Sequence, residues 1–284
     1  MSWFPTISGY TTVYNCIKNE YPWEKTIESM LGFCDEVVVV DSGSDDGTWE
    51  RLEELSREKE NLIIKQNSID WDHPRFAYHS DGMQKAYARD LCTGDFCWQM
   101  DSDEFVLPKD FQKIRNLVKR FPKLSDLVAL PIVEFWGSFD KVRVDINPWK
   151  WRISRNKNHI THGIPKELQR FDENGGMYTA PGSDTCDYIS KETSERIPFI
   201  AYYSEDVEAE RRKALLHDTE ALEKYENWYN GVSDAVPTVY HTSWLDIERK
   251  IKLYKSYWSK FWLSQYNVPI EDNPDNNMFF DKSW

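Results

Sequence analysis

The sequence predicts an α/β fold with a mostly parallel sheet that is flanked by helices. Strand and helix patterns alternate through the first half of the chain in the order β-α-β-α-β-α-β. Within that order, residues 37–40, VVVV, form a short apolar run, which is typical of a strand buried on both faces of a parallel sheet. Such sheets have right-handed crossovers and bind their ligands beyond the carboxyl ends of the strands.

The individual elements of the first half follow from local patterns. We expect strands within residues 9–17, 35–40, 61–67 and 95–100, and helices within residues 21–34, 48–60, 80–91 and 110–121. The second of these helices is typical, because Trp49, Leu52 and Leu55 recur at the spacing of one helix face. Polar turns follow Val40 and Met100, so both turns fall at the carboxyl edge of the predicted sheet.

The second half of the chain is less regular. Residues 126–138 predict a strand pair or a bent strand, a glycine-containing loop region follows, and helices are expected over 205–228 and 243–265. We therefore expect a ligand-binding domain over residues 1–200 and a helical C-terminal extension over residues 201–284 that packs on it.

The composition limits the classes of function. The chain of 284 residues has 13 Trp, 15 Tyr and 14 Phe, whose flat faces suit sugar rings and nucleobases as well as a core. The formal net charge of −13 argues against a protein that binds nucleic acid over its whole surface. Nucleic acid is therefore the least favoured partner, although the charge leaves room for a local contact.

The ends and the cysteines of the chain predict a cytoplasmic protein. The first residues, MSWFPTISGYTT, show no basic segment followed by an apolar one, so we expect no signal peptide. No apolar run approaches the length of about 18 residues that would span a membrane. The five cysteines form no CxxC pair, which is typical of reduced thiols.

The first polar turn stands in the segment VVVVDSGSDDGT. Asp41 ends the strand, where a carboxylate can accept hydrogen bonds from a base or a ribose, and the turn lets a ligand approach the backbone. The alternative is an Asx-rich turn that caps the helix at Thr48. For this motif alone, the capping interpretation is favoured.

The second polar turn, in the segment QMDSDEF, gathers three carboxylates. Asp101 and Asp103 alternate with Ser102, so in an extended chain both carboxylates face one side. Two or three oxygen ligands beside a diphosphate are a common way to hold Mg²⁺ or Mn²⁺. Such an ion would neutralise the carboxylates and the charge on a departing nucleotide. The alternative is an acidic turn between a strand and a loop.

The two turns and the segments around them resemble a known family. KNEYPWEKTIESMLGFCDEVVVVDSGSDDGT, followed by IDWDHPRFAYHSDGMQKAYARDLCTGDFCWQMDSDEF, is similar to the family 2 glycosyltransferases of the GT-A fold, nearest to the bacterial lipopolysaccharide-core glucosyltransferase branch. That branch shows Asn-Glu after the first strand, Val-Asp-Ser-Gly-Ser-x-Asp-Gly-Thr after the second and Asp-x-Asp-Glu after the fourth. The likeness covers residues 10–108 and continues more loosely through WKWRISRNKNHITHGIPKEL.

The resemblance implies a nucleotide-sugar site at matching positions of this chain. Asp41 would contact the uracil or ribose, Asp101 the ribose or the metal, and Asp103 the metal directly. His241, a late histidine, would complete the site for Mn²⁺ or Mg²⁺. In full, the residues expected at the nucleotide are Asn19, Glu20, Asp41, Ser42, Lys85, Arg89, Asp101 and Ser102, and those expected at the metal are Asp101, Asp103 and His241.

An inverting transfer also needs a carboxylate that takes the proton of the acceptor hydroxyl. Glu167 in HGIPKEL matches the His-Glu region of the family, with a different spacing. Asp184 and Asp187 in GSDTCDY are alternatives. Glu205 and Asp206 are a further pair, at a predicted helix start where acidic residues are common because of the helix dipole.

The resemblance implies a metal-dependent glycosyltransferase. It would transfer a hexose, with inversion, from a nucleoside diphosphate sugar such as a UDP-sugar to a glycan, a lipid-linked saccharide or another hydroxyl acceptor. One alternative is a nucleotidyltransferase of similar architecture, which would have a glycine-rich loop where this chain has CIKNEYPWE. The other is a non-catalytic carbohydrate-binding protein, which would not need Asp101 and Asp103.

The closing helix is amphipathic. One apolar stripe contains Ile247, Ile251, Tyr254, Trp258 and Phe261, with lysines and arginines around it. Packing on the catalytic domain is the favoured interpretation, because the chain as a whole is acidic. The alternative is a peripheral contact with the anionic inner face of a membrane that holds a lipid-linked acceptor.

Overall fold

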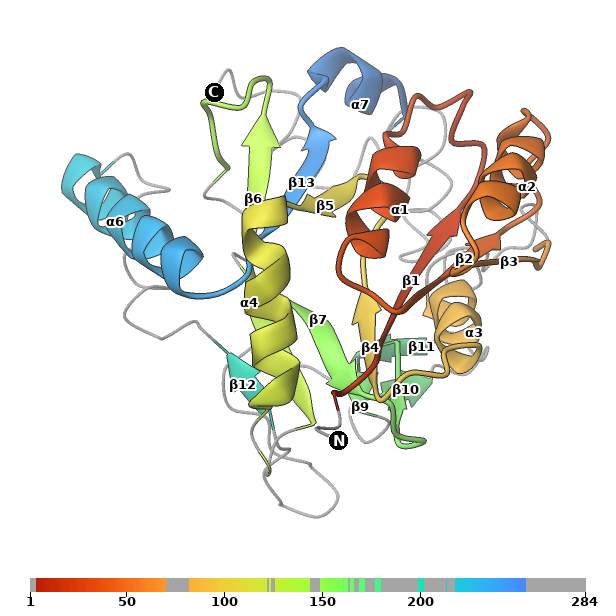
Figure 1. Ribbon diagram of the computed structural model, residues 1–284. Helices are drawn as coiled ribbons and strands as arrows, with labels where there is room; N and C mark the ends of the chain where they lie inside the picture. Colours follow the sequence, from red (N-terminus) through yellow and green to blue (C-terminus); the bar gives the residue numbers. More distant parts are fainter. Residues whose placement is uncertain are drawn as a thin grey trace.

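The fold combines a mixed sheet with helices on both of its faces (Figure 1). The computed structural model describes residues 4–69, 82–121, 123, 126–143, 149–162, 164–165, 169–171, 177–179, 199–201, 213 and 218–253. Among these residues, no helix is both long and apolar enough to cross a membrane.

The first part of the sheet is parallel, as the sequence predicts. β1 (Ile7–Val13) lies between β2 (Glu36–Asp41) and β4 (Phe96–Gln99). β3 (Leu62–Gln66) pairs with the other edge of β2, and all three pairings are parallel. The carboxyl ends of β1, β2 and β4 therefore meet at one edge of the sheet, which is where the two polar turns begin.

Helices cover both faces of this parallel part. α1 (Trp23–Leu31), α2 (Thr48–Glu58) and α4 (Pro108–Lys119) contribute apolar side chains to one buried cluster with the sheet. α3 (Gln84–Asp90) contributes to a second, smaller cluster. Each of the four helices lies where the sequence predicts one, with ends that differ by a few residues.

β2 shows why a continuous apolar run suits this position. Val37 and Val39 join the larger cluster, whereas Val38 and Val40 join the cluster under α3, and all four are fully buried. Because successive side chains of a strand point to opposite faces, a strand covered on both faces needs apolar residues at every position. Each buried valine contributes about 1.5–3 kcal/mol relative to an exposed one.

Beyond β4 the sheet becomes mixed. β7 (Trp149–Arg155) is antiparallel to both β4 and β6 (Leu127–Trp136). β13 (Val239–Trp244) is parallel to β6 and antiparallel to β5 (Glu104–Val106), and β12 (Phe199–Ala201) is parallel to β6. β6 is a single strand with a register shift in its pairing to β7, which agrees with the bent-strand alternative.

Several shorter elements complete the described part of the chain. They are β8 (Ile160–Thr161), β9 (Ile164–Pro165), β10 (Gln169–Phe171), β11 (Met177–Thr179), α6 (Thr219–Ala235) and α7 (Ile247–Leu253). β8 pairs with β9 and β10 pairs with β11, each in an antiparallel pair outside the main sheet. α6 ends seven residues later than the helix predicted to end at 228.

The start of the closing helix differs from the prediction of a helix from residue 243. Ser243 and Trp244 belong to β13, because Trp244 continues the pairing with Trp136 of β6. α7 begins only at Ile247. Tyr254, Trp258 and Phe261 of the predicted apolar stripe lie outside the described residues. β13 comes from within the predicted C-terminal extension, and the division of the chain at residue 200 stays a prediction.

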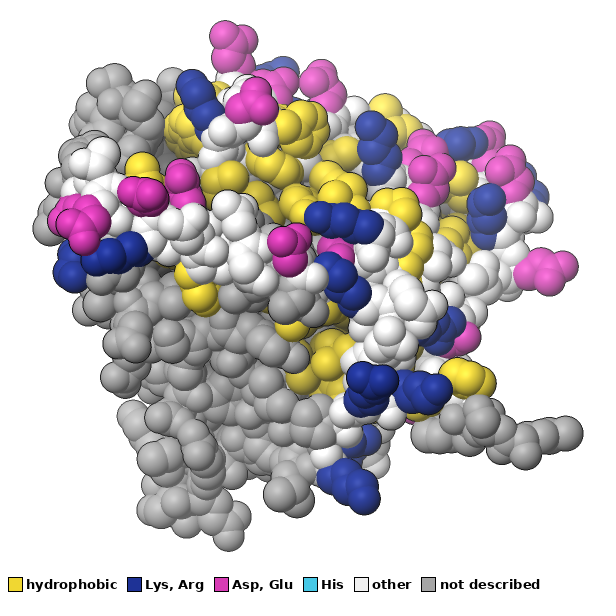
Figure 2. Space-filling view, turned by 60° about the vertical axis from the view of Figure 1, so that its left-hand side comes forward, with side chains coloured by type: hydrophobic (Ala, Val, Ile, Leu, Met, Phe, Trp, Pro, Cys, Tyr) yellow, Lys and Arg dark blue, Asp and Glu magenta, His cyan; other side chains and the backbone are white. Residues whose placement is uncertain are grey.

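Acidic and basic side chains are mixed on the described surface. Figure 2 shows Lys and Arg side chains among Asp and Glu side chains on one face, with a group of basic ones at its lower right. The described acidic side chains on this face therefore form no single patch.

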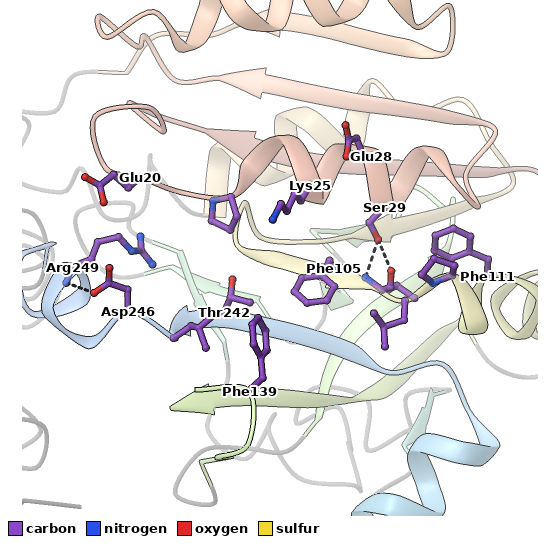
Figure 3. A pocket seen from close by; sticks show the side chains of 15 residues that line it. Glu20, Lys25, Glu28, Ser29, Phe105, Phe111, Phe139, Thr242, Asp246 and Arg249 are labelled. Carbon is purple, nitrogen blue, oxygen red and sulfur yellow. Dashed lines mark hydrogen bonds between the residues drawn. The ribbon is translucent and has the colours of Figure 1, made fainter. Parts of the chain in front are cut away.

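Ser29 of α1 holds β5 in place. Its hydroxyl donates to the carbonyl oxygen of Val106 at 2.9 Å and accepts from the N–H of Val106 at 2.8 Å (Figure 3). β5 directly follows the acidic turn, so these two hydrogen bonds fix the chain on the far side of that turn.

We predict that Ser29→Ala lowers the free energy of unfolding by about 1–3 kcal/mol, because two buried backbone groups lose their partner. Urea denaturation measures the loss. Ser56→Ala is the matched control, since its hydroxyl bonds only the Glu53 carbonyl of its own helix, and a change within about 0.5 kcal/mol is expected. Equal losses in the two variants would contradict the role of Ser29.

Candidate functional site

The turn after β2 is held by its own side chains. Asp41 is fully buried, and its Oδ1 accepts from the N–H groups of Gly43 and Ser44, each at 3.0 Å, and from Gln66 Nε2 at 3.2 Å. The Ser44 hydroxyl donates to Oδ2. Gly43 has a φ of 94°, in the left-handed region that favours glycine. Ser42 is also buried. Contact of Asp41 and Ser42 with a nucleotide stays a prediction.

Asp46, which precedes the N-cap Gly47, bonds the first residue of α2 and joins it to the loop after β1. Its Oδ1 accepts from the N–H of Thr48 at 3.0 Å and from the Thr48 hydroxyl at 2.6 Å, and its Oδ2 accepts from the Lys18 N–H at 2.7 Å. The Thr48 oxygen in turn accepts from the Cys16 N–H at 3.0 Å. Burial raises the pKa of Asp46, but the Lys18 N–H and Thr48 donors outweigh it, so the pKa is lowered.

Three cationic side chains surround Asp101 in the second turn. Its Oδ1 lies 2.6 Å from Lys85 Nζ and accepts from Gln99 Nε2 at 2.9 Å. Its Oδ2 faces Arg152 Nη2 at 3.4 Å and Lys150 Nζ at 3.9 Å. Burial alone would raise the pKa of Asp101, but Lys85, and then Arg152 and Lys150, hold it well below its usual range. The Asp101 side chain keeps 26% of its surface exposed.

Arg152 is the buried centre of this network. Its guanidinium donates to Gln99 Oε1 and to Glu104 Oε1, besides facing Asp101. Glu104 is fully buried, and its Oε2 accepts from the N–H of Asp101 at 3.0 Å. Burial lowers the pKa of Arg152, but Glu104 and then Asp101 raise it by more. The charge of Glu104 is thus compensated within the protein.

Asp103 pairs with His241 rather than with the cations around Asp101. Its Oδ1 lies 3.1 Å from His241 Nε2, and His241 Nδ1 bonds Glu134 Oε2. The Asp103 carbonyl accepts from the N–H of Thr242 at 3.0 Å and from its hydroxyl at 2.8 Å. Burial lowers the pKa of His241, but Asp103 and then Glu134 raise it to about 10. Burial raises the pKa of Asp103, and His241 lowers it by more.

Lys250 adds a buried ammonium beside this pair. Its Nζ donates to the Ser243 hydroxyl, and the side chain is buried. Burial lowers the pKa of Lys250, against the opposing charges of Asp103 and Glu134. α7 and β13 therefore place charged groups at the acidic turn.

The donors near the turn fit a metal ion only in part. Among the described residues, no group of three or more His, Cys, Asp or Glu side chains could hold a metal ion. Asp103 and His241 supply one carboxylate and one imidazole, which suit Mn²⁺. Ions of this kind often take one or two carboxylates and complete their shell with substrate phosphates. The donors therefore fit an ion that a diphosphate helps to hold.

Arg89 and Lys85 stand one helical turn apart on α3, but their side chains contact different parts of the protein. Arg89 is buried, and its guanidinium donates to the carbonyl oxygens of Arg155 at 2.9 Å and Ile160 at 3.2 Å. It thereby ties α3 to the end of β7 and the start of β8. Of these two side chains, it is Lys85 that contacts Asp101. A nucleotide contact of Arg89 stays a prediction.

Asn19 and Glu20 lie beside α7. The Asn19 carbonyl accepts from Arg249 at 3.2 Å, and Glu20 is in the left-handed region with a φ of 55°. Glu20 lines a pocket of about 700 Å³ between α1, β5 and the start of α7 (Figure 3). The aromatic residues of its walls are Phe105, Phe111 and Phe139. Residues 101–104 are not among its lining residues, but Thr242, which bonds the Asp103 carbonyl, is.

The remaining predicted residues have little or no structural description. Ser102 is half-buried between the two aspartates. Glu167, Asp184, Asp187, Glu205 and Asp206, the candidates for the general base, lie outside the described residues. The identity of the base stays a prediction.

Sequence reasoning missed several charged residues of the network. They are Glu134, Lys150, Arg152 and Lys250. Glu134 left a signal, since a lone carboxylate within the apolar run LVALPIVEFW must be paired if that strand is buried. Arg152 stands in WKWRISR, where its alternation with apolar residues places it on one face of a strand.

The fold and the site define a class of protein. A sheet with helices on both faces, which carries an acidic turn and basic side chains at its carboxyl edge, is the architecture of α/β enzymes that bind a ligand there. The family model "Glycosyl transferase family 2" matches residues 10–178, which is more than half of the chain. The chain therefore belongs to glycosyl transferase family 2, and the prediction of a glycosyltransferase with an α/β, GT-A fold is confirmed.

Solved structures with some similarity include two of TarS from S. aureus. One covers 53% of this chain and 28% of that chain, with 21% identity and a TM-score of 0.38. The other, TarS 1–349 in complex with UDP, covers 53% and 47%, with 22% identity and a TM-score of 0.39. A mannosyltransferase from Pyrobaculum calidifontis, in complex with GDP-Man and Mn²⁺, covers 45% and 36%, with 20% identity and a TM-score of 0.36.

In these matches the aligned part spans less than half the length of the solved chains. No curated protein matches the sequence significantly.

We predict that Arg152→Met lowers the free energy of unfolding by about 3–5 kcal/mol, because it removes the buried counter-ion of Glu104 and leaves only the more exposed Lys150 at 3.5 Å. Urea denaturation at neutral pH measures the loss. Arg51→Met is the control: Arg51 pairs with Glu24 and Glu54 at the surface, so a loss below about 1 kcal/mol is expected. A loss of that small size in Arg152→Met would contradict the central role of the guanidinium.

Asp46 makes a pH-dependent contribution to stability. Its pKa in the folded protein is lower than in the unfolded chain, so the contribution is present above about pH 4 and is lost as the pH falls through the folded value. We expect the wild type to exceed Asp46→Asn by up to about 1 kcal/mol at pH 7, and the difference to shrink below pH 4. Denaturation across this range measures it, with Asp45→Asn, at the exposed neighbouring position, as the control for the loss of one carboxylate.

Proposed function

We propose that this glycosyltransferase binds a nucleoside diphosphate sugar at the carboxyl edge of β1, β2 and β4. The preferred candidate is a UDP-sugar. It transfers a hexose with inversion to a hydroxyl of a glycan or a lipid-linked saccharide. The observation that carries the proposal is the turn with Asp101 and Asp103 at this edge, with Lys85, Lys150 and Arg152 around it.

The charges at the turn suit a diphosphate. Lys85 and Lys150 keep 12% and 36% of their side-chain surface exposed, and their ammonium groups lie beside the partly exposed Asp101. Negative charge grows on the diphosphate as the sugar leaves, and fixed cations in a partly buried site stabilise it. Arg152 is tied to Gln99 and Glu104, so it holds the turn in shape.

Asp103 and His241 are the proposed metal ligands. Mn²⁺ or Mg²⁺ bound there would neutralise part of the diphosphate charge. Glu134 bonds the second ring nitrogen of His241 and so sets the orientation of the ring. The proton of the acceptor hydroxyl would go to one of Glu167, Asp184 and Asp187.

Motif likeness supports a finer placement within the family. The Asn-Glu, Val-Asp-Ser-Gly-Ser and Asp-x-Asp-Glu segments support the lipopolysaccharide-core glucosyltransferase branch, and with it a cytoplasmic enzyme whose lipid-linked acceptor lies at the inner membrane face. A catalytic domain over 1–200 with an extension over 201–284 belongs to the same proposal. Membership of family 2 disfavours the nucleotidyltransferase and the non-catalytic carbohydrate-binding protein.

Calorimetric titration with UDP-, GDP- and CMP-sugars, each with and without Mn²⁺, tests the proposal. We expect one UDP-sugar to bind in the presence of Mn²⁺ and to bind more weakly without it. If no nucleotide sugar binds in the presence of the metal, the proposal fails.

We further predict that Asp103→Ala removes metal-dependent nucleotide binding, with an affinity loss of at least about tenfold and no loss of fold. Titration calorimetry measures the affinity, and circular dichroism checks the fold. Asp140→Ala, at an exposed position, is the control and keeps wild-type affinity. Wild-type affinity in Asp103→Ala would remove this residue from the site.

A further inference from the structure

The segment of α4 is basic in an otherwise acidic protein. Residues 108–123, which contain α4 and the residues just after it, include six Lys or Arg residues and one Asp, whereas the whole chain has a formal net charge of −13. The one acidic residue, Asp110, is buried and pairs with Lys113 at 2.7 Å. It therefore places no carboxylate on the outer surface of the segment.

The exposed side of α4 lies opposite the side that packs on the sheet. Ile114 and Val118 are buried in the core cluster that the helix shares with α1 and the sheet (Figure 1). The exposed positions recur at i, i+3, i+7 and i+10, and they are Lys109, Gln112, Asn116 and Lys119. Side chains at this spacing lie along one side of a helix, so lysines and amides share the outer face of α4.

The exposed cations of the segment form what we call the basic face. Its members are Lys109, Lys119, Arg120 and Lys123, the last of which follows the end of the helix. Among the residues that the structure describes, no carboxylate lies within ion-pair distance of these four side chains. Their charges are therefore available to a partner.

Apolar side chains lie at both ends of the basic face. At its carboxyl end, Phe4 is 64% exposed, and the Lys119 ammonium lies 5.1 Å from the centre of its ring. At its amino end, Pro108 and Phe111 of the first turn of α4 line the pocket of about 700 Å³ (Figure 3). Exposed aromatic rings beside lysines and arginines are typical of segments that lie at a membrane interface.

An anionic lipid surface fits this combination. Its phosphates attract the cations, and its shallow apolar layer accommodates aromatic side chains, whereas a soluble polyanion would use the cations alone. The net charge of −13 does not oppose such a contact. Salt screens exposed charges beyond about 8 Å at physiological ionic strength, so the side chains nearest to the lipid determine the attraction.

We propose that the basic face of α4, together with Phe4, is a docking surface for an anionic lipid bilayer. The inference goes beyond the proposed function and does not require donor binding. It places the contact on residues 108–123 rather than on the closing helix. Docking of this kind would hold the enzyme at the surface where a lipid-linked acceptor lies.

Co-sedimentation of the full chain with vesicles tests the inference. We expect vesicles of equal parts of phosphatidylcholine and phosphatidylglycerol to be bound at least about tenfold more tightly than vesicles of phosphatidylcholine alone, and the difference to shrink as salt rises. Each cation near an anionic surface strengthens binding about fivefold. The triple variant Lys119→Gln, Arg120→Gln and Lys123→Gln should therefore bind the anionic vesicles at least about twentyfold more weakly. Phe4→Ser should weaken the same binding about threefold.

The matched control is the triple variant Arg57→Gln, Lys59→Gln and Lys65→Gln. It makes the same change of net charge at exposed positions on α2, just after α2 and on β3, and we expect binding within about twofold of the wild type. Equal losses in the two triple variants would overturn the inference, and so would equal binding of the wild type to both kinds of vesicle.

Two further measurements distinguish the remaining outcomes. Binding of heparin without any binding to vesicles would overturn the inference, because it would assign the basic face to a soluble polyanion. Calorimetric titration with nucleotide sugars tests the proposed function separately, and we expect the α4 triple variant to keep the wild-type donor affinity. Failure of donor binding in the wild type would overturn the proposed function and leave the docking surface in place.

Discussion

The buried guanidinium of Arg152 is the contact on which the acidic turn depends. It bonds Gln99 at the end of β4 and Glu104 at the start of β5, and it faces Asp101 between them. A buried carboxylate without a partner is strongly destabilising, so the turn needs this cation whether or not a ligand is bound. β7 supplies it because β7 runs antiparallel to β4 and brings its own residues alongside the turn.

Separate compensation also keeps the three carboxylates of the turn functionally distinct. Arg152 holds Glu104 inside the protein, and His241 holds Asp103 against β13. Asp101 faces Lys85 and remains partly exposed. The three carboxylates of one turn thus have different surroundings, because their nearest cations come from β7, β13 and α3.

Local sequence patterns predicted the strands and helices of the first half and the edge of the sheet that carries the polar turns. They did not predict the counter-ions of the acidic side chains. The run of valines at 37–40 identified a strand covered on both faces, and the alternation of strands and helices identified the parallel order. The counter-ions come from residues distant in the sequence, such as Arg152, 53 residues from Gln99, and His241, 138 residues from Asp103. Helical spacing likewise grouped Lys85 with Arg89, yet Lys85 contacts Asp101 whereas Arg89 bonds the carbonyl oxygens of Arg155 and Ile160.

β13 makes the carboxyl-terminal part of the chain a component of the site. It pairs with β6, which carries Glu134, and with β5, which follows Asp103, so His241 is fixed between two carboxylates by the register of three strands. Lys250 of α7 adds its charge to the same group. Because charged pairs in a partly buried site respond to small changes of distance, a shift of β13 relative to β6 would alter the electrostatics of Asp103 directly. The strand order of the sheet therefore determines the chemistry of the turn as much as the residues of the turn do.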